Sequence, residues 1–244
     1  MSLEVINQDY ENLVKNIKTY FDKSNDILHQ ARNSIKIINY QNKKLVVKSF
    51  KIPAILNKIK YTFFSNSKAQ KSYQNSIKVG NHTPKAIGYI EFKKFGLISS
   101  SYFVAESFKY NWTMHAPLHN NIFEDKNNLL KLFASFVHKL HQKNILHLDL
   151  SPGNVLVQKA QNDYIFKIVD TNRMSFKKLS LNERLKNFEK LWAKDIDMKT
   201  IAKQYAKISL EYENYCIKKA IYYSQKNKYI VNIKKRLKGK KVVD

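Results

Sequence analysis

Two side chains able to do proton and cation chemistry lie close together in the middle of the chain. Asp149 and Asn154 are five positions apart in residues 147–154, HLDLSPGN, between the apolar residues 145–146 and 155–157. A carboxylate on a turn can accept a proton from a hydroxyl, and an amide oxygen can coordinate Mg²⁺. An ordinary polar turn between two buried segments, with Pro and Gly as turn residues, would have a similar sequence.

The spacing of these two residues resembles the His-x-Asp-x-x-x-x-Asn loop of protein-kinase-like phosphotransferases. In that loop the Asp accepts the proton of the attacking hydroxyl, and the Asn binds the Mg²⁺ that neutralises the nucleotide phosphates. The resemblance implies that Asp149 is the base and Asn154 a metal ligand. A short motif alone leaves the ordinary turn open.

Two further segments support the kinase interpretation. Residues 164–170 read as an apolar strand that ends in Asp170, where kinases keep the Asp of Asp-Phe-Gly, the principal Mg²⁺ ligand. Residues 44–50 read as a strand that carries Lys48, as in the Val-Ala-Ile-Lys strand whose lysine contacts the ATP phosphates. Taken alone, Lys48 would be an exposed strand residue and Asp170 a strand-end residue. Their order and separation favour a kinase that uses ATP and Mg²⁺.

The composition indicates a folded, strongly basic protein. The chain has 244 residues, of which 43% are hydrophobic, and 44 Lys plus Arg against 19 Asp plus Glu give a formal net charge of +25. This charge suits a polyanion such as nucleic acid, acidic lipid or a phosphorylated glycan. Abundant Lys, Asn, Ile and Tyr are also typical of AT-rich genomes, so the charge gives no firm evidence for nucleic acid. The single cysteine, Cys216, excludes an intramolecular disulfide.

The chain shows no sign of export or of membrane insertion. Its first residues include acids and form no apolar stretch of secretory length, and no stretch approaches eighteen uninterrupted apolar residues. We therefore expect a cytoplasmic protein, at most peripheral on a membrane. The basic residues 226–241 are a candidate for contact with anionic lipid headgroups, and a solvated, frayed tail is the alternative.

Hydrophobic periodicity predicts an α+β fold. The predicted elements are a helix from Val5 to Phe21, strands at 35–38, 45–50, 86–91 and 96–106, helices at 67–79 and 128–142, and mostly helix after Met174. We expect a single protein-kinase-like domain of two lobes. Its predicted parts are a small antiparallel-sheet N-lobe (about 1–106), a hinge (about 107–111), a mostly helical C-lobe (about 112–226) and a basic tail (about 227–244). His138 and His141 are expected to be helix-surface or hydrogen-bonded histidines rather than metal ligands.

Several runs carry a more specific resemblance. Residues 46–53, 67–75, 83–91, 147–154 and 169–174 are similar to the Kdo/WaaP-type lipopolysaccharide kinase family, most closely to its Bacteroidetes branch. The resemblance implies a protein-kinase-like fold, ATP as donor, Mg²⁺, and as acceptor a sugar hydroxyl of the lipopolysaccharide inner core, on Kdo or heptose. It also implies a place on the cytoplasmic face of the inner membrane.

The resemblance also assigns site residues, with two departures. Glu106 and Phe108 would lie near the adenine, and Lys48 would contact the phosphates. Where such kinases pair this lysine with a glutamate, the chain has Gln74, whose amide oxygen could still accept a weaker, uncharged hydrogen bond. The phosphate-covering loop, expected at residues 30–33, lacks glycine, so Arg32 and Asn33 would offer side-chain donors instead. The chain also lacks an Ala-Pro-Glu element, which disfavours a peptide substrate.

Three alternatives stay open. Gln74 and the glycine-free loop would suit a pseudokinase that binds nucleotide or acts as a scaffold. A small atypical kinase, acting on another small molecule or in tRNA threonylcarbamoyl modification, would share the minimal two-lobed plan. A plain nucleic-acid-binding protein would rest on the charge alone.

Overall fold

The computed structural model describes residues 1–30, 33–50, 54, 59–120, 122–161 and 163–239. The chain forms two compact units. The first comprises Met1–Lys109 and the short segment Val169–Arg173, and the second comprises Tyr110–Ile168 and Met174–Asp244. Asp170 therefore belongs to the first unit, although most of its sequence neighbours belong to the second.

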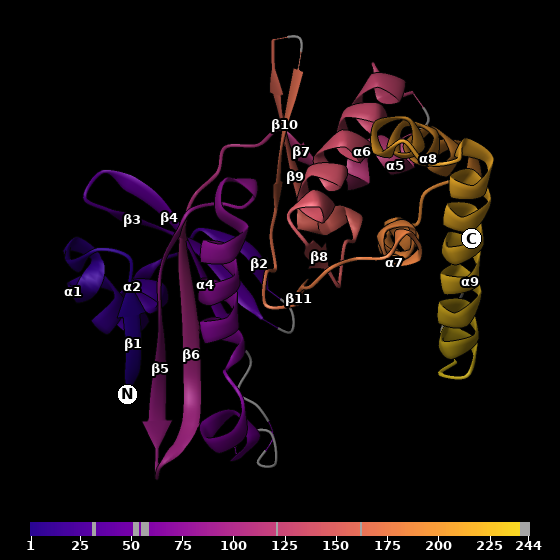
Figure 1. Cartoon of the computed structure of the whole chain (residues 1–244). Coiled ribbons are helices and arrows are strands. Elements are labelled where there is room, and N and C mark those ends of the chain that lie inside the picture. Colours follow the sequence, from indigo (N-terminus) through magenta and orange to yellow (C-terminus); the bar gives the residue numbers. More distant parts are fainter. Residues whose placement is uncertain (31–32, 51–53, 55–58, 121, 162, 240–244) are drawn as a thin grey trace. The chain divides into compact units, whose positions relative to one another are not determined.

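The first unit is built on a six-stranded antiparallel sheet with the strand order β1-β5-β6-β4-β3-β2 (Figure 1). Its strands are β1 (Ser2–Val5), β2 (Ile27–Gln30), β3 (Ser34–Tyr40), β4 (Lys43–Phe50), β5 (Ala86–Lys94) and β6 (Leu97–Glu106). The helical segments are η1 (Gln8–Tyr10), α1 (Glu11–Lys15), α2 (Ile17–Lys23), η2 (Lys60–Phe64), α4 (Lys68–Val79) and η3 (Gly80–His82).

Alternation along β4 assigns its side chains to two different cores. Leu45 and Val47 are fully buried in a cluster with residues of α1 and α2, whereas Phe50 is buried in a second cluster with residues of α4. Because successive strand side chains point to opposite faces, Lys48 lies on the same face as Phe50. Its cross-strand neighbour Phe103 packs against that same second cluster. The strand pattern thus places Lys48 on the face that α4 covers.

Helix α4 has clear start and stop signals. Ser67 is its N-cap and accepts a hydrogen bond from the backbone N–H of Gln70 (3.2 Å). Gly80 ends the helix with φ +63°, a conformation that glycine adopts without steric cost. The buried side of the helix carries small and hydroxyl residues, among them Ser72 and Ser76, which lets another segment approach closely.

The second unit contains two small sheets and most of the helices. Its strands are β7 (Trp112–Thr113), β8 (Ile145–His147), β9 (Val155–Ala160), β10 (Asp163–Ile168) and β11 (Met174–Phe176), paired in the orders β10-β9-β7 and β11-β8. Its helical segments are α5 (His115–His119), α6 (Lys126–Gln142), η4 (Pro152–Asn154), α7 (Leu181–Lys186), η5 (Asn187–Leu191), α8 (Asp195–Ser209) and α9 (Glu213–Arg236).

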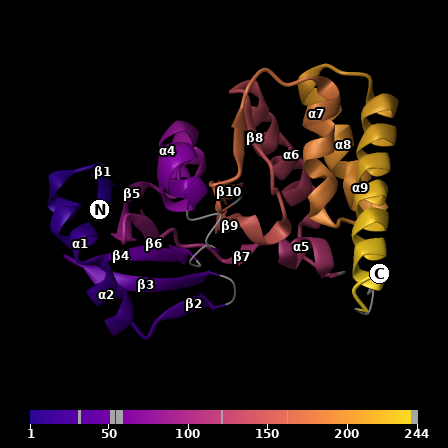
Figure 2. The same cartoon turned by 90° about the horizontal axis from the view of Figure 1, so that it is seen from below.

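The helices of the second unit enclose an aromatic core. Helix α8 packs against both α6 and α9, which can be followed in Figure 2. Phe133 of α6, Phe188 of η5 and Tyr205 of α8 are fully buried, and the ring of Phe188 contacts both others edge-on. Such contacts add to the burial of apolar area. This core fixes η5 against α6, and η5 in turn contacts the loop that carries Asp149.

The structure confirms the α+β class, with an antiparallel sheet followed by a mostly helical part. Two local predictions differ. Val5 lies in β1 rather than in a helix, because residues 2–5 pair with β5. Residues 227–236, expected in a basic tail, continue α9, which ends at Arg236. The assignment of a single domain with lobe and hinge boundaries stays a prediction. Among the described helices, none combines the length and the apolar composition needed to cross a bilayer.

Candidate active site

In the first unit, Lys48 and Asp170 form an ion pair between Nζ and Oδ1. Both side chains are largely buried, with 14% and 24% of their surface exposed, and the Lys48 ammonium also lies 5.2 Å from the centre of the Phe50 ring. A partly buried pair is screened by solvent less than a surface pair. The structure therefore brings together the two residues expected to contact phosphate and metal.

The backbone beside Asp170 is held by α4 through Thr171. The buried Thr171 hydroxyl donates to the carbonyl oxygen of Ser72 (3.1 Å) and lies 2.9 Å from the Ser76 hydroxyl, while its own carbonyl accepts from Asn75 Nδ2 (2.7 Å). Asp170 itself has φ +62°, a left-handed conformation that costs a non-glycine residue about 1–3 kcal/mol. The three hydrogen bonds of Thr171 offset that cost and fix the direction of the Asp170 side chain.

Gln74 does not take the place of the missing glutamate. Its Oε1 accepts a hydrogen bond from Asn66 Nδ2 (2.9 Å), and the carboxylate that pairs with Lys48 is that of Asp170. The expected hydrogen bond between Lys48 and Gln74 is thus not formed in the described structure. The physical reason is that an amide oxygen competes poorly with a carboxylate for an ammonium group. Lys48 is held firmly, but by a different residue.

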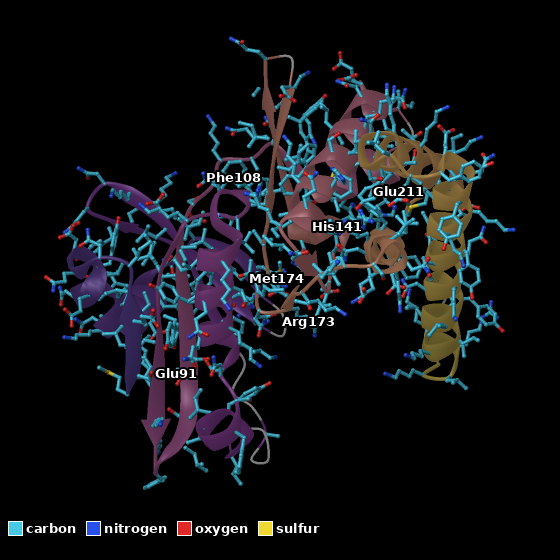
Figure 3. The ribbon with its side chains drawn as sticks, viewed as in Figure 1. Glu91, Phe108, His141, Arg173, Met174 and Glu211 are labelled. Atoms are coloured by element: carbon cyan, nitrogen blue, oxygen red, sulfur yellow. The ribbon has the colours of Figure 1, made fainter. Side chains whose placement is uncertain are left out.

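The other nucleotide-binding candidates of the first unit lie at strand ends. Asn33 lies between β2 and β3, two strands of an antiparallel pair, and Arg32 lies outside the described residues. Glu106 ends β6, and its N–H donates to the carbonyl oxygen of Lys85 (2.8 Å). Phe108 follows in the segment that leaves the sheet (Figure 3).

In the second unit, buried anchors hold the loop that carries Asp149. His147, Leu150 and Pro152 are buried, and the backbone N–H of Asp149 donates to His147 Nδ1 (3.1 Å). The side chain of Asp149 keeps 25% of its surface exposed. A carboxylate on a loop fixed at both sides, and reachable from solvent, is suited to receive a proton from a bound hydroxyl.

Asn154 is oriented by the backbone of Asp149. Its Nδ2 donates to the Asp149 carbonyl oxygen (2.9 Å), which also accepts from the Ser151 N–H (2.7 Å). Since the amide nitrogen is used inside the loop, Oδ1 is the atom that can coordinate a cation. Carboxylate and amide oxygens are suitable ligands for Mg²⁺, so Asn154 Oδ1 and the Asp170 carboxylate fit this metal by their chemistry. Within the described residues, no group of three or more His, Cys, Asp and Glu is arranged to hold a metal.

Sequence reasoning missed Lys190, which contacts the proposed base directly. Its Nζ donates to Asp149 Oδ1 (3.2 Å) and to the Leu148 carbonyl oxygen (2.7 Å). Lys190 lies in η5, 41 positions after Asp149, and belongs to no local motif. Among 44 cationic residues, nothing in the sequence distinguishes it, and only its contacts identify it.

A second residue of η5, Asn187, holds the same loop. Asn187 Nδ2 donates to the His147 carbonyl oxygen (2.7 Å), and Asn187 Oδ1 lies 3.0 Å from His141 Nε2. His141 Nδ1 lies 2.9 Å from the Tyr205 hydroxyl, so both ring nitrogens have partners. Burial lowers the pKa of His141 to about 4, and the ring is neutral at pH 7. His141, labelled in Figure 3, is therefore a structural histidine, as expected.

A pocket of about 500 Å³ lies in the second unit between α6, α8 and the start of α9. Its lining includes Lys131, Lys203 and Glu211, and none of the candidate residues lines it. The site residues thus form two local groups. Lys48 and Asp170 are joined in the first unit, and Asp149, Asn154 and Lys190 are joined in the second.

Comparison with known proteins gives two findings. The model of the lipopolysaccharide kinase (Kdo/WaaP) family matches residues 76–212, more than half of the chain. That stretch contains Asp149, Asn154, Asp170 and Lys190, whereas Lys48 and Gln74 precede it.

The fold is similar to that of a solved structure described as WaaP in complex with acyl carrier protein. The TM-score is 0.64 at 12% sequence identity, and the similarity covers 94% of this chain and 99% of the other. At that identity the likeness concerns the fold alone. Among curated protein sequences, none matches this chain significantly.

Proposed function

Because this chain belongs to the lipopolysaccharide kinase (Kdo/WaaP) family, we propose that it transfers the γ-phosphoryl group of ATP to a sugar hydroxyl of the lipopolysaccharide inner core, on Kdo or heptose. The enzyme is a kinase, a phosphotransferase that acts on an alcohol group. The observation that supports the proposed mechanism best is the fixed loop in which Asp149 and Asn154 are joined through one backbone carbonyl.

Asp149 is the proposed base. Its carboxylate is oriented by Lys190 and by the anchored loop, so it can align an acceptor hydroxyl and take up its proton as the phosphoryl group is transferred. Phosphoryl transfer depends mainly on positioning and on neutralisation of charge. A rigid loop therefore contributes to the rate by limiting the orientations of the hydroxyl.

Asn154 and Asp170 are the proposed ligands of Mg²⁺. When bound, the metal ion would neutralise charge on the nucleotide phosphates. Asn154 presents Oδ1 because its Nδ2 is held by Asp149, and Asp170 presents a carboxylate whose backbone is fixed by Thr171. Both ligand directions are thus determined by neighbouring hydrogen bonds.

Two lysines are the proposed cationic partners of the phosphates. Lys48 would contact the α- and β-phosphates from β4, in keeping with its place on the strand. Lys190 would supply positive charge beside Asp149, where the γ-phosphoryl group meets the acceptor. An ammonium group aimed at developing negative charge in a partly buried site stabilises a transition state more than it would in water.

Adenine recognition is proposed at the chain segment around Glu106 and Phe108. The N–H groups of Glu106 and Ser107 already donate to the carbonyls of Lys85 and Lys44. A backbone donor to the adenine ring must therefore come from another residue of this segment. Arg32 and Asn33 stay proposed donors to the phosphates.

The proposal is tested by incubating the purified protein with ATP, Mg²⁺ and purified lipopolysaccharide core. The expected result is release of ADP, with the core gaining the mass of one phosphoryl group on a Kdo or heptose residue. Phosphorylation of another small molecule or of tRNA, but not of the core, would show that the acceptor differs from the proposed sugar. Nucleotide binding without any turnover would favour the scaffold alternative over the kinase. In that case Gln74 and the glycine-free loop would be signs of lost activity.

A further inference from the structure

Helix α9 has one buried side and one unusual exposed side. Cys216, Ala220 and Ser224, spaced four residues apart, are fully buried where α9 packs against α7, η5 and α8. On the opposite side lie Tyr215, Tyr222 and Tyr229, with 37%, 50% and 67% of their surface exposed. Residues seven apart lie two helical turns apart on nearly the same line. Tyr222 and Tyr229 therefore form a stripe that points to solvent. Tyr215 begins the stripe, and its hydroxyl donates to Asn182 Oδ1 of α7 (2.9 Å).

Two further exposed apolar side chains lie beside this stripe, near the end of the helix. Ile230 and Leu237 are 39% and 82% exposed. Single exposed apolar residues are ordinary on a protein surface, whereas several on one broad face of a helix indicate a binding surface.

Cations line the stripe. The Lys219 ammonium lies 5.6 Å from the ring centre of Tyr215, and the Lys226 ammonium lies 5.6 Å from that of Tyr222. Lys234 and Arg236 are exposed near the end of the helix. We call the set Tyr215, Lys219, Tyr222, Lys226, Tyr229, Ile230, Arg236 and Leu237 the outer face of α9.

The outer face carries charge of one sign. Glu213 is the single acidic residue of α9, and it pairs with Lys203 of α8 (3.4 Å). Two other lysines of the helix are turned toward the protein. Lys228 donates to the Ala193 carbonyl oxygen (2.7 Å), and the Lys235 ammonium lies over the Trp192 ring. The described carboxylates form no ion pair with the cations of the outer face, whose charge is therefore directed at a partner.

We propose that the outer face of α9 docks on the surface of an anionic lipid bilayer, with the helix lying in the plane of the interface. Tyrosine is enriched at the level of lipid headgroups, because its ring is apolar and its hydroxyl is hydrated. Isoleucine and leucine would enter the boundary of the acyl chains, and the flanking lysines would reach the phosphates above them.

The apolar residues favour lipid over the other polyanions. Duplex nucleic acid attracts lysine and arginine through its phosphates, but its backbone offers nothing for Ile230 and Leu237 to bind. A bilayer interface accommodates both kinds of side chain at once. If the proposed function holds, this docking would keep the enzyme beside an acceptor that is itself anchored by lipid. The binding itself does not depend on kinase activity.

The test uses the full chain and sedimentation with vesicles of phosphatidylcholine alone or with about one third phosphatidylglycerol. Three variants are compared with the wild type. Lys219→Gln/Lys226→Gln removes two cations of the outer face, and Tyr222→Gln/Tyr229→Gln removes two rings at constant charge. Lys139→Gln/Lys199→Gln is the matched control, because it removes two exposed lysines from α6 and α8. Circular dichroism confirms that each variant is folded.

We expect the wild type to bind the anionic vesicles and not the neutral ones. Its affinity for the anionic vesicles should fall as the salt concentration rises. Each cation lost from the outer face should weaken binding about fivefold, so the double lysine variant should lose about 25-fold. The tyrosine variant should lose about tenfold or more at any salt concentration, since the lost area is apolar. The control should change less than about twofold, because the field of the headgroups decays within a Debye length.

Three results would overturn the proposal. They are an absence of binding to anionic vesicles, an equal loss in the control and the Lys219/Lys226 variant, and full binding by the tyrosine variant. A wild type that binds RNA but no vesicles would assign the surface to nucleic acid instead. Transfer of phosphate to a soluble, deacylated core reports separately on the proposed function. The outer-face variants should retain that activity.

Discussion

Single side chains around Asp149 determine whether its carboxylate is correctly placed. Lys190 holds both the carboxylate and the preceding carbonyl, and Asn154 holds the carbonyl of Asp149 itself. The proposed base is thus held by one residue of its own turn and by another that lies 41 positions away. Each of these hydrogen bonds and charges can be removed by a single substitution.

Replacing Lys190 by methionine should lower kcat about 10²-fold, while the KM for ATP changes little. The lost charge acts on the transferred phosphoryl group and on the direction of Asp149, which matter most in the transition state. Lys190→Arg should restore part of the rate, because it keeps the charge. Lys186→Met, one turn earlier and exposed, is the control and should behave as wild type. A Lys190→Met enzyme with normal kcat would rule out this role.

His141 makes stability dependent on pH. Its folded-state pKa, about 4, lies below its usual value because burial disfavours the charged ring. Between pH 6.5 and about 4 the unfolded chain binds the proton and the folded protein does not, so the stability is present above pH 6.5 and is lost as pH falls. The maximum loss is about 3 kcal/mol.

Denaturant unfolding at several pH values measures this loss. His141→Gln should be destabilised at pH 7 and should lose less than the wild type between pH 6.5 and 4. His29→Gln, at an exposed position, should keep the slope of the wild type. Equal slopes in His141→Gln and wild type would show that His141 does not cause the acid sensitivity.

Among the secondary-structure elements, α4 holds the segment that carries Asp170. The helix begins and ends at strong signals, Ser67 and Gly80, and its buried side offers Ser72, Asn75 and Ser76 to Thr171. In protein kinases a charged pair between a helix glutamate and the strand lysine orders that lysine. In this chain Lys48 pairs instead with Asp170, and α4 holds the Asp170 segment through the hydrogen bonds of Thr171.

Thr171→Val tests whether α4 positions Asp170 through the hydrogen bonds of Thr171. The variant keeps the shape of the side chain but leaves the buried Ser72 carbonyl and Ser76 hydroxyl with one partner fewer, at a cost of about 1–3 kcal/mol. We expect a lower melting temperature and a reduced kcat, with more Mg²⁺ needed for half-maximal rate. Thr171→Ser keeps the hydroxyl and should recover most of both. If Thr171→Val bound Mg²⁺-ATP and turned over normally, α4 would not position Asp170.

In the whole molecule, the proposed reaction needs residues from both compact units. Asp170 belongs to the first unit and Asn154 to the second. If both bind Mg²⁺, Asp170→Asn and Asn154→Ala should each reduce the rate at least as strongly as loss of the base, and excess Mg²⁺ should restore part of it. A titration of the rate with Mg²⁺ measures this. An unchanged Mg²⁺ requirement in Asn154→Ala would show that Asn154 is not a ligand of the metal.

The sequence was informative where function is encoded locally. Asp149 and Asn154 lie within one turn, and Lys48 lies in a strand whose alternation fixes its face, so pattern and spacing are sufficient to select them as candidates. Lys190, Thr171 and Asn187 act through contacts made by residues distant in sequence, and only the folded chain reveals them. The spacing of Val5 from Tyr10 predicts a helix, whereas in the structure its pairing with β5 places it in a strand.

The most direct test of the central claim is the rate of ADP release by wild type and Asp149→Asn with ATP, Mg²⁺ and lipopolysaccharide core. The amide has nearly the shape of the carboxylate but cannot take up the proton. We predict a loss of about 10²- to 10⁴-fold in kcat, with unchanged folding and nucleotide affinity. Undiminished turnover by a folded Asp149→Asn protein would contradict the account.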